Sequence, residues 1–254
     1  MKPNLYIDTY EPYTPCNAGV RTLHYLGAML EAAEIPVVCS HQNFYNPRTI
    51  VRDHIKPDEI AVYPDATRGN PFNAKRICRW MLYYAEGLFG GDRIPKEEAV
   101  IVCHETYLWS IRAHCDHPIP DEDVVSIPTL DPTWCFPQAK TIENVVYYAQ
   151  ADRKKFKPLP FEYVEVPPLS EPLDRCHAQS LALMRRAKNF FCFHNSTMAQ
   201  EAALCGCNVY RVFEHGIESQ EGIMTLAKKF SRNPATDPAL AKRFAERVYS
   251  FFGL

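Results

Sequence analysis

The sequence predicts an α/β protein that contains two parallel-sheet units. Short apolar runs alternate with amphipathic stretches along most of the 254 residues, which is the pattern of strands joined by crossover helices. Hydrophobic residues make up 46% of the chain and charged residues 23%, a balance typical of a folded globular protein. Pro128, Pro132 and Pro137 interrupt the alternation, so we expect one domain over residues 1–135 and a second over 136–237.

The first half shows the apolar runs expected of buried strands. They cover residues 5–8, 36–39, 60–64, 99–103 and 123–127. The run at 99–103 is almost wholly apolar, as expected for a parallel strand that is covered on both faces. Helices are predicted over 18–33 and 73–84, where apolar residues recur at helical spacing; the second places on one face Ile77, Trp80, Met81 and Tyr84.

The same alternation restarts after the prolines. Strands are expected over residues 144–148, 163–166, 190–193 and 208–212, and helices over 173–187 and 197–204. A last amphipathic helix opens at 237–238 and carries on one side Leu240, Phe244, Val248 and Phe251. Parallel sheets bind ligands at the carboxyl ends of their strands, and two facing units would place a site in the cleft between them.

Composition and charge argue against several classes of protein. The net charge of −2 disfavours a nucleic-acid binder, which normally carries a basic excess. No run of about 18 apolar residues is present. The apolar stretch at the N-terminus is too short for a signal peptide, so we expect a soluble, cytoplasmic protein. The ten cysteines include no C-x-x-C pair, and several lie in apolar segments, which indicates reduced core thiols.

The most informative segment covers residues 193–209. It predicts a strand, a polar turn, a short helix capped by Ser196 or Thr197, a stop at Gly206 and another strand. Hydroxyls and N–H groups converge at such a helix start, where an anion can bind. Glu201 lies one turn further on the same face, where a carboxylate can accept hydrogen bonds from a ribose diol. The alternative is an ordinary capped helix with a surface glutamate.

The segment from Ser196 to Val209 follows the pattern Ser-Thr-x-x-x-Glu-Ala-x-x-x-Gly-x-x-Val, which resembles the nucleotide-sugar signature of GT-B glycosyltransferases. That family has two Rossmann-like domains facing across a cleft, and the signature lies in the second. The resemblance implies that Glu201 contacts the donor ribose and that the diphosphate is contacted by Asn195, Ser196 and Thr197. It also implies that the final helix, residues 238–254, crosses back to the first domain. The second domain is shorter than is usual in the family, so we expect a reduced member.

Two segments of the first half resemble the same family. The sequence around Gly19 is similar to the first loop and helix of bacterial GT-B enzymes, where a glycine-containing loop lies against the donor phosphates or the acceptor. Residues 64–80 resemble the Y-P-E-x-x-x-G-N-P segment of some bacterial polysaccharide glycosyltransferases. Without the resemblance, Gly19 belongs to a plain helix start, and 64–80 is a turn followed by a basic helical face.

Further candidates come from polar residues that follow strands. His104 follows the apolar run at 99–103 and is expected to face the cleft. It could contact the transferred sugar or its phosphate, take a proton from an acceptor hydroxyl, or be a structural histidine. GT-B donor sites often place an Arg and a Lys after the strand at 144–148. Arg153 and Lys157 are the nearest match, and a solvated basic loop is the alternative.

Two segments that contain cysteine and histidine are candidates for metal binding. Cys103-His104 and His114-Cys115-Asp116-His117 offer suitable zinc ligands, but their spacing matches no familiar zinc motif. No metal-binding D-x-D motif is recognised either. We therefore expect no metal, and no cofactor beyond a nucleotide sugar acting as substrate.

Together these observations predict a metal-independent glycosyltransferase of glycan or polysaccharide biosynthesis. Its partners would be a nucleotide-sugar donor and a saccharide or lipid-linked acceptor, with no nucleic acid. Peripheral membrane contact is expected through side chains of the first domain, namely Arg76, Arg79, Trp80 and Tyr83. The alternatives are a non-catalytic GT-B-like subunit that binds a nucleotide or glycan for a partner, and a zinc-dependent hydrolase.

Overall fold

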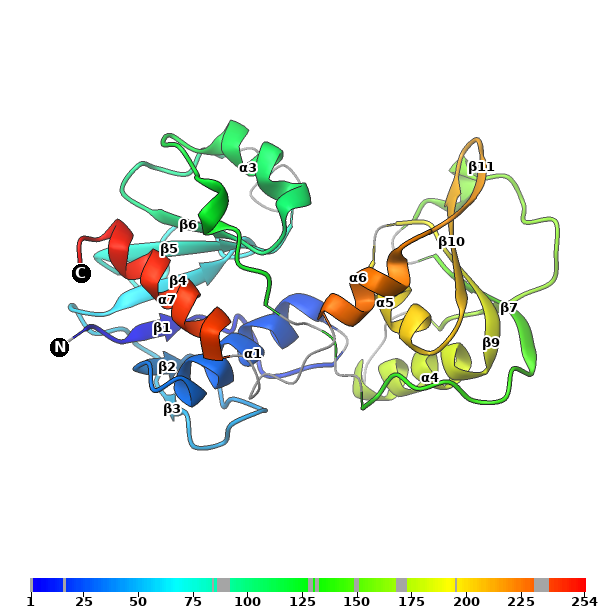
Figure 1. The fold of residues 1–254 in the computed structure, drawn as a ribbon, viewed down its shortest axis with the longest axis horizontal. Helices are drawn as coiled ribbons and strands as arrows, with labels where there is room; N and C mark the ends of the chain where they lie inside the picture. Colours follow the sequence, from blue (N-terminus) through cyan, green and yellow to red (C-terminus); the bar gives the residue numbers. More distant parts are fainter. Residues whose placement is uncertain are drawn as a thin grey trace. The chain divides into compact units, whose positions relative to one another are not determined.

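The chain forms two compact units, seen in a computed structural model (Figure 1). The structure describes residues 2–15, 17–83, 85, 92–127, 130, 133–148, 151–167, 173–194, 196–230 and 238–254. The first unit consists of residues 1–13, 19–129 and 234–254, and the second of residues 14–18 and 130–233. Each unit contains its own sheet, so the predicted α/β class is confirmed.

The first unit is built on a six-stranded parallel sheet with the order β3-β2-β1-β4-β5-β6. The strands are β1 (Leu5–Ile7), β2 (Val37–Cys39), β3 (Ile50–Val51), β4 (Ile60–Pro64), β5 (Arg76–Met81) and β6 (Ala99–Val102). The helices of this half are α1 (Ala18–Ala32), α3 (Leu108–His114) and α7 (Pro238–Phe251), with 3-10 turns at Glu105–Tyr107 and Asp121–Asp123. Strands β1, β2, β4 and β6 and helices α1 and α7 lie where the sequence predicts them.

The helix predicted over residues 73–84 is wrong, because its centre is strand β5. This strand lies between β4 and β6 and is covered on both faces, so its apolar residues do not alternate with polar ones. Trp80 is fully buried, and Arg79 is 2% exposed and ion-paired to Glu98. Neither residue is therefore available for the membrane contact predicted from a helical face. The strand predicted at 123–127 is also largely absent: within the described residues only Val124 forms an isolated bridge, to Val102.

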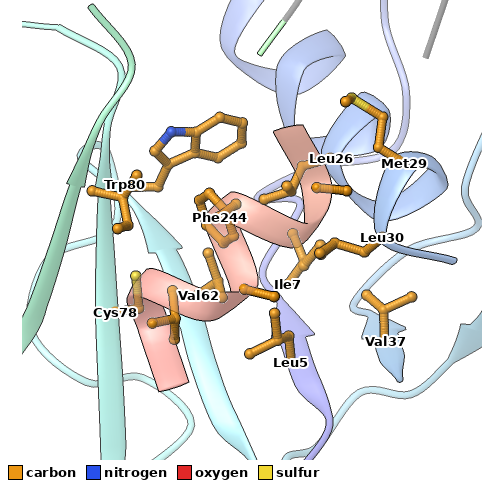
Figure 2. Close-up of a cluster of buried hydrophobic side chains, with 14 of the residues drawn as sticks. Leu5, Ile7, Leu26, Met29, Leu30, Val37, Val62, Cys78, Trp80 and Phe244 are labelled. Atoms are coloured by element: carbon orange, nitrogen blue, oxygen red, sulfur yellow. The ribbon is translucent and has the colours of Figure 1, made fainter. Parts of the chain in front are cut away.

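The C-terminal helix α7 completes the core of the first unit (Figure 2). Phe244 is fully buried and meets Trp80 edge to face, with ring centroids 5.4 Å apart. Two polar contacts fix the same helix: the Tyr249 hydroxyl donates to the carbonyl of Pro3 at 2.8 Å, and Arg247 pairs with Asp123 at 2.6 Å. Residues from opposite ends of the chain thus share one hydrophobic core.

Helix α1 approaches the loop after β2 closely at Gly27. A Cβ at this position would lie 2.7 Å from Asn43 Nδ2 and 3.0 Å from Cys39 Sγ. We expect Gly27→Ala to lower the free energy of unfolding by about 1–3 kcal/mol, because a methyl group must be forced into this contact. Urea denaturation measures the change. An exposed helical glycine gains about 1 kcal/mol on the same substitution, so a stabilised variant would contradict the close packing.

The second unit contains a five-stranded mixed sheet with the order β11-β10-β9-β7-β8. Its strands are β7 (Ile142–Tyr147), β8 (Val164–Glu165), β9 (Ala187–Cys192), β10 (Asn208–Phe213) and β11 (Gly216–Ser219). All neighbours are parallel except β10 and β11, which form an antiparallel hairpin. The helices are α4 (Leu173–Arg186), α5 (Thr197–Leu204) and α6 (Ile223–Phe230), with a 3-10 turn at Arg153–Lys155.

The two faces of this second sheet are covered differently. Side chains of one face, including Val145 and Phe190, pack with helices α4 and α5 in one hydrophobic cluster. Side chains of the other face, including Phe191 and Phe193, pack instead against Phe156 and other residues of the segment after β7. The described part of that segment carries a 3-10 turn, and no helix longer than that turn. No helix in the described residues of the chain is long and apolar enough to cross a membrane.

Candidate functional site

Each sheet has a point at which the strand order reverses. In the first sheet the chain leaves β1 for β2 on one side and later returns to β4 on the other side. In the second sheet it leaves β7 for β8 and returns to β9 on the opposite side of β7. Such switch points open a crevice at the carboxyl ends of the strands, where α/β proteins bind ligands. The candidate residues lie at different distances from these two points.

Helix α5 begins directly beside the switch point of the second sheet, after strand β9. Its first residue is Thr197, as predicted, and Ser196 is the N-cap with φ −141° and ψ 142°. The Ser196 hydroxyl accepts a hydrogen bond from the Met198 N–H at 3.1 Å. Gly206 follows the helix with φ +80°, in the left-handed region that favours glycine at this stop. The candidate Asn195 lies outside the described residues.

Glu201 is not a surface glutamate. It is 1% exposed, and its carboxylate oxygens lie 3.3 and 3.4 Å from Nε2 of His177, which belongs to helix α4. The His177 ring also meets Trp134 edge to face, with centroids 5.8 Å apart. Nothing in the local sequence pattern marks His177, because it meets Glu201 only through the packing of α4 on α5.

The basic residues after β7 lie near the same switch point but on the surface. Arg153 forms an ion pair with Glu165 of β8, and its guanidinium lies 4.1 Å from the centre of the Tyr148 ring. Lys157 is exposed two residues beyond the 3-10 turn. The charge of Arg153 is therefore already balanced within the unit, and exposed pairs of this kind contribute little to stability.

The remaining candidates, Gly19 and His104, belong to the first unit. Gly19 is the second residue of helix α1. His104 follows β6, the edge strand, which three strand intervals separate from β1. At roughly 4.8 Å per interval this amounts to about 14 Å. Nδ1 of His104 accepts a hydrogen bond from the Thr106 N–H at 3.2 Å and so caps the 3-10 turn.

Within the segment 64–80, residues 65–75 form the predicted turn, but residues 76–80 belong to strand β5 and not to a basic helical face. Asp65 accepts a hydrogen bond from the Leu82 N–H at 2.9 Å, and burial raises its pKa to about 6. Arg79 donates to the carbonyls of Thr67 at 2.8 Å and Gly69 at 2.5 Å. Gly69 itself has φ +64°. The motif thus fixes the chain where β4 ends, beside the switch point.

A polar cluster that sequence analysis missed lies at the switch point of the first sheet. The carboxylate of Asp8, directly after β1, accepts a hydrogen bond from Thr67 Oγ1 at 2.9 Å. On its other side, Ser40 and His41 follow β2 and bond to Thr9. The only sequence signal is that each group follows the end of a predicted strand.

The segments considered for zinc do not form a metal cluster. Among the described residues, no group of three or more His, Cys, Asp or Glu side chains is placed to hold a metal ion. Burial raises the pKa of the Cys115 thiol to about 12, and the Cys103 thiol donates to the carbonyl of Leu82. The sequence also holds a D-x-D triplet at Asp121–Asp123. It forms a 3-10 turn, and its two aspartates pair with arginines of α3 and α7.

Eight cysteines of the described residues are free thiols. Most of them are buried in apolar surroundings, in agreement with the prediction of reduced core thiols.

In comparisons with known proteins, no family model matches this chain and no curated protein matches its sequence.

Proposed function

We propose that the protein is a metal-independent glycosyltransferase of GT-B type, which moves a sugar from a nucleotide-sugar donor to a saccharide or lipid-linked acceptor. The proposal rests on one observation above the others. A helix capped by Ser196 starts directly after β9, at the switch point of the second sheet, with Glu201 one turn further on. This is where an α/β sheet offers hydroxyls, N–H groups and the positive end of a helix dipole to an anion.

In the proposed reaction the acceptor hydroxyl oxygen attacks the anomeric carbon of the donor sugar. The bond from that carbon to the diphosphate oxygen breaks, and the electron pair leaves with the nucleoside diphosphate. The start of α5, with Ser196 and Thr197, stabilises the developing negative charge, because these donors are already oriented. Arg153, which is ion-paired with Glu165, would have to exchange this partner for the diphosphate to add positive charge there. The acceptor proton needs a separate base.

The proposal gives Glu201 the role of holding the donor ribose. Its contacts with His177, at 3.3 and 3.4 Å, are longer than the usual hydrogen-bond range. For a ribose hydroxyl to bind one carboxylate oxygen, the proposal requires the 1% exposed Glu201 to become accessible when the nucleotide binds, while the His177 ring keeps the carboxylate oriented. The proposed donor site therefore depends on both α4, which carries His177, and α5, which carries Glu201.

A thermal-shift screen with UDP, GDP, ADP, CMP and dTDP, with and without EDTA, tests this proposal. One diphosphate should stabilise the protein, and about 2.7 kcal/mol is expected at roughly 100 times its dissociation constant. Glu201→Gln should weaken binding of that nucleotide at least tenfold. The matched control is Glu143→Gln, because Glu143 is an exposed glutamate of the same unit, paired with Lys188.

The outcomes separate the proposed function from its alternatives. EDTA should leave the shift unchanged. A nucleotide shift together with no sugar transfer from the corresponding nucleotide sugar would favour the non-catalytic binding subunit. Loss of stability in EDTA alone would favour the zinc-dependent hydrolase. No shift with any nucleotide would overturn the proposal.

A further inference from the structure

Two cysteine thiols of the second unit lie in contact with each other. The thiol of Cys135, in the segment before β7 (residues 133–141), donates a hydrogen bond to Sγ of Cys205, which directly follows helix α5. Both are free thiols of one hydrophobic cluster, in which Cys135 is 8% exposed and Cys205 is fully buried. They are far apart in the sequence, so their contact depends on how the segment before β7 packs on the helices.

The segment before β7 is held firmly against the ends of α4 and α5. Lys140 Nζ donates to the carbonyl of Arg185, at the end of α4, at 3.2 Å and to the carbonyl of Cys205 at 2.7 Å. A Cβ at Gly206 would lie 3.2 Å from the Cβ of Pro137, so the two main chains approach closely beside the cysteines. Polar and packing contacts thus fix both chain segments at the point where the two thiols meet.

The surroundings of the pair favour the thiolate form of Cys205. The hydrogen bond from Cys135 lowers the pKa of the Cys205 thiol below its ordinary value. The positive charges of Arg185 and Lys140 act in the same direction, whereas burial and a nearby carboxylate oppose it. By contrast, burial raises the pKa of Cys207, a thiol of the same cluster, to about 12. Because the thiolate is the reactive form of cysteine, Cys205 is better prepared for reaction than Cys207.

We infer that Cys135 and Cys205 form a redox site, at which a small peroxide converts the two thiols into a disulfide within the folded second unit. The inference goes beyond the proposed function and does not rest on it, because it requires no nucleotide, no sugar and no residue of the first unit. The new bond would join the segment before β7 to the end of α5, the helix that carries Glu201.

The oxidation balances in two steps. The Cys205 thiolate attacks one oxygen of the peroxide, the O–O bond breaks, and the sulfur becomes a sulfenic acid while the other oxygen leaves and takes up a proton. The Cys135 sulfur then attacks the sulfur of the sulfenic acid, the S–O bond breaks, and the thiol proton leaves with the oxygen as water. The thiols together give up two electrons and two protons, all of which the peroxide takes up. A thiol reductant reverses the reaction by exchange.

The burial of the pair selects the kind of oxidant. Cys135 is 8% exposed and Cys205 is fully buried, so the pair lies just beneath the surface of the unit. A bulky disulfide such as glutathione disulfide would have to displace the surrounding side chains before it reached either sulfur. Hydrogen peroxide is close to water in size, and it is therefore the probe used in the tests.

Peptide mapping of the oxidised protein tests the inference directly. The reduced whole chain is treated with hydrogen peroxide under native conditions, and the remaining thiols are alkylated after unfolding. We expect two of the ten cysteines to escape alkylation. They should appear in linked peptides that join Cys135 to Cys205, and dithiothreitol should separate these peptides. Alkylation of both cysteines, oxidation without a linked peptide, or a disulfide to any other cysteine overturns the inference.

Single substitutions test the role of each thiol. In Cys135→Ala, oxidation should stop at the sulfenic acid of Cys205, which dimedone traps when the protein is unfolded. In Cys205→Ala, Cys135 should stay reduced, because the attacking thiolate is gone. The matched control is Cys207→Ala, since the Cys207 thiol donates to the carbonyls of Met184 at 3.0 Å and Ala187 at 3.3 Å. This variant should form the Cys135–Cys205 link as the unsubstituted protein does. Oxidation of Cys135 at an undiminished rate in Cys205→Ala overturns the assignment of the attacking thiol.

Thermal unfolding tests whether the bond fits the folded unit. A disulfide between distant residues restricts the unfolded chain, so the peroxide-treated protein should melt at a higher temperature than the reduced protein. Dithiothreitol should return the melting temperature to that of the reduced protein. Cys207→Ala should show the same rise, and Cys205→Ala should show none. A linked protein that melts at a lower temperature would show that the bond strains the fold, and this result overturns the inference.

Discussion

Phe244→Ala is expected to lower the free energy of unfolding of the first unit by about 3–5 kcal/mol. The side chain is fully buried between α7 and the sheet and packs edge to face on Trp80, so its removal leaves a cavity lined by both. Chemical denaturation followed by tryptophan fluorescence measures the loss. Phe251→Ala is the control on the same helix, since Phe251 is 39% exposed. Equal effects of the two substitutions would show that α7 is not part of the core.

Asp65→Asn is expected to remove a pH dependence of stability. Burial raises the pKa of Asp65 from 3.8 to about 6 in the folded protein. The folded state therefore favours the protonated carboxyl, and this stabilisation is complete below pH 3.8 and is lost as the pH rises through about 6. At about 1.36 kcal/mol per pKa unit, the loss amounts to about 3 kcal/mol. Asparagine keeps an oxygen that can accept the Leu82 N–H.

The measurement is the difference in unfolding free energy between Asp65→Asn and the unsubstituted protein from pH 4 to pH 7. As the pH rises over this range, the variant should become more stable relative to the unsubstituted protein by about 3 kcal/mol. His24, whose pKa burial lowers to about 4, has the opposite effect on stability in the same range. It is present in both proteins and cancels in the comparison. Parallel pH profiles would contradict the burial of an ionising Asp65.

Elements that are marked by a helix cap, a glycine stop or an amphipathic pattern were predicted correctly from the sequence. Helix α5 begins at Thr197, as expected from its serine cap and glycine stop, and α7 follows its amphipathic pattern closely. Strand β5 was mistaken for a helix because a strand covered on both faces loses its alternation. Strands β3 and β11 were not predicted, since both are short and exposed and carry little apolar signal.

The candidate site depended more on tertiary packing than on local pattern. The capped start of α5 could be predicted because the cap, the glutamate and the glycine lie within one segment. The burial of Glu201 could not, because it depends on His177, which is 24 positions away in the sequence. The same holds for the polar cluster at the switch point of the first sheet. Its members, such as Asp8 and His41, follow different strands and meet only when the sheet forms. Proximity of this kind is fixed by sheet order, which no local pattern encodes.

The central claim is that a nucleotide binds at the start of helix α5 in the second unit. Hydrogen–deuterium exchange with and without the nucleotide that gives the largest shift in the thermal-shift screen of UDP, GDP, ADP, CMP and dTDP tests it most directly. We expect slower exchange in peptides that cover the end of β9 and the first turn of α5. At a nucleotide concentration near the dissociation constant of the unsubstituted protein, the Glu201→Gln variant should show much weaker protection of the same peptides. Protection confined to other segments, with unchanged exchange around Ser196 and Thr197, would contradict it.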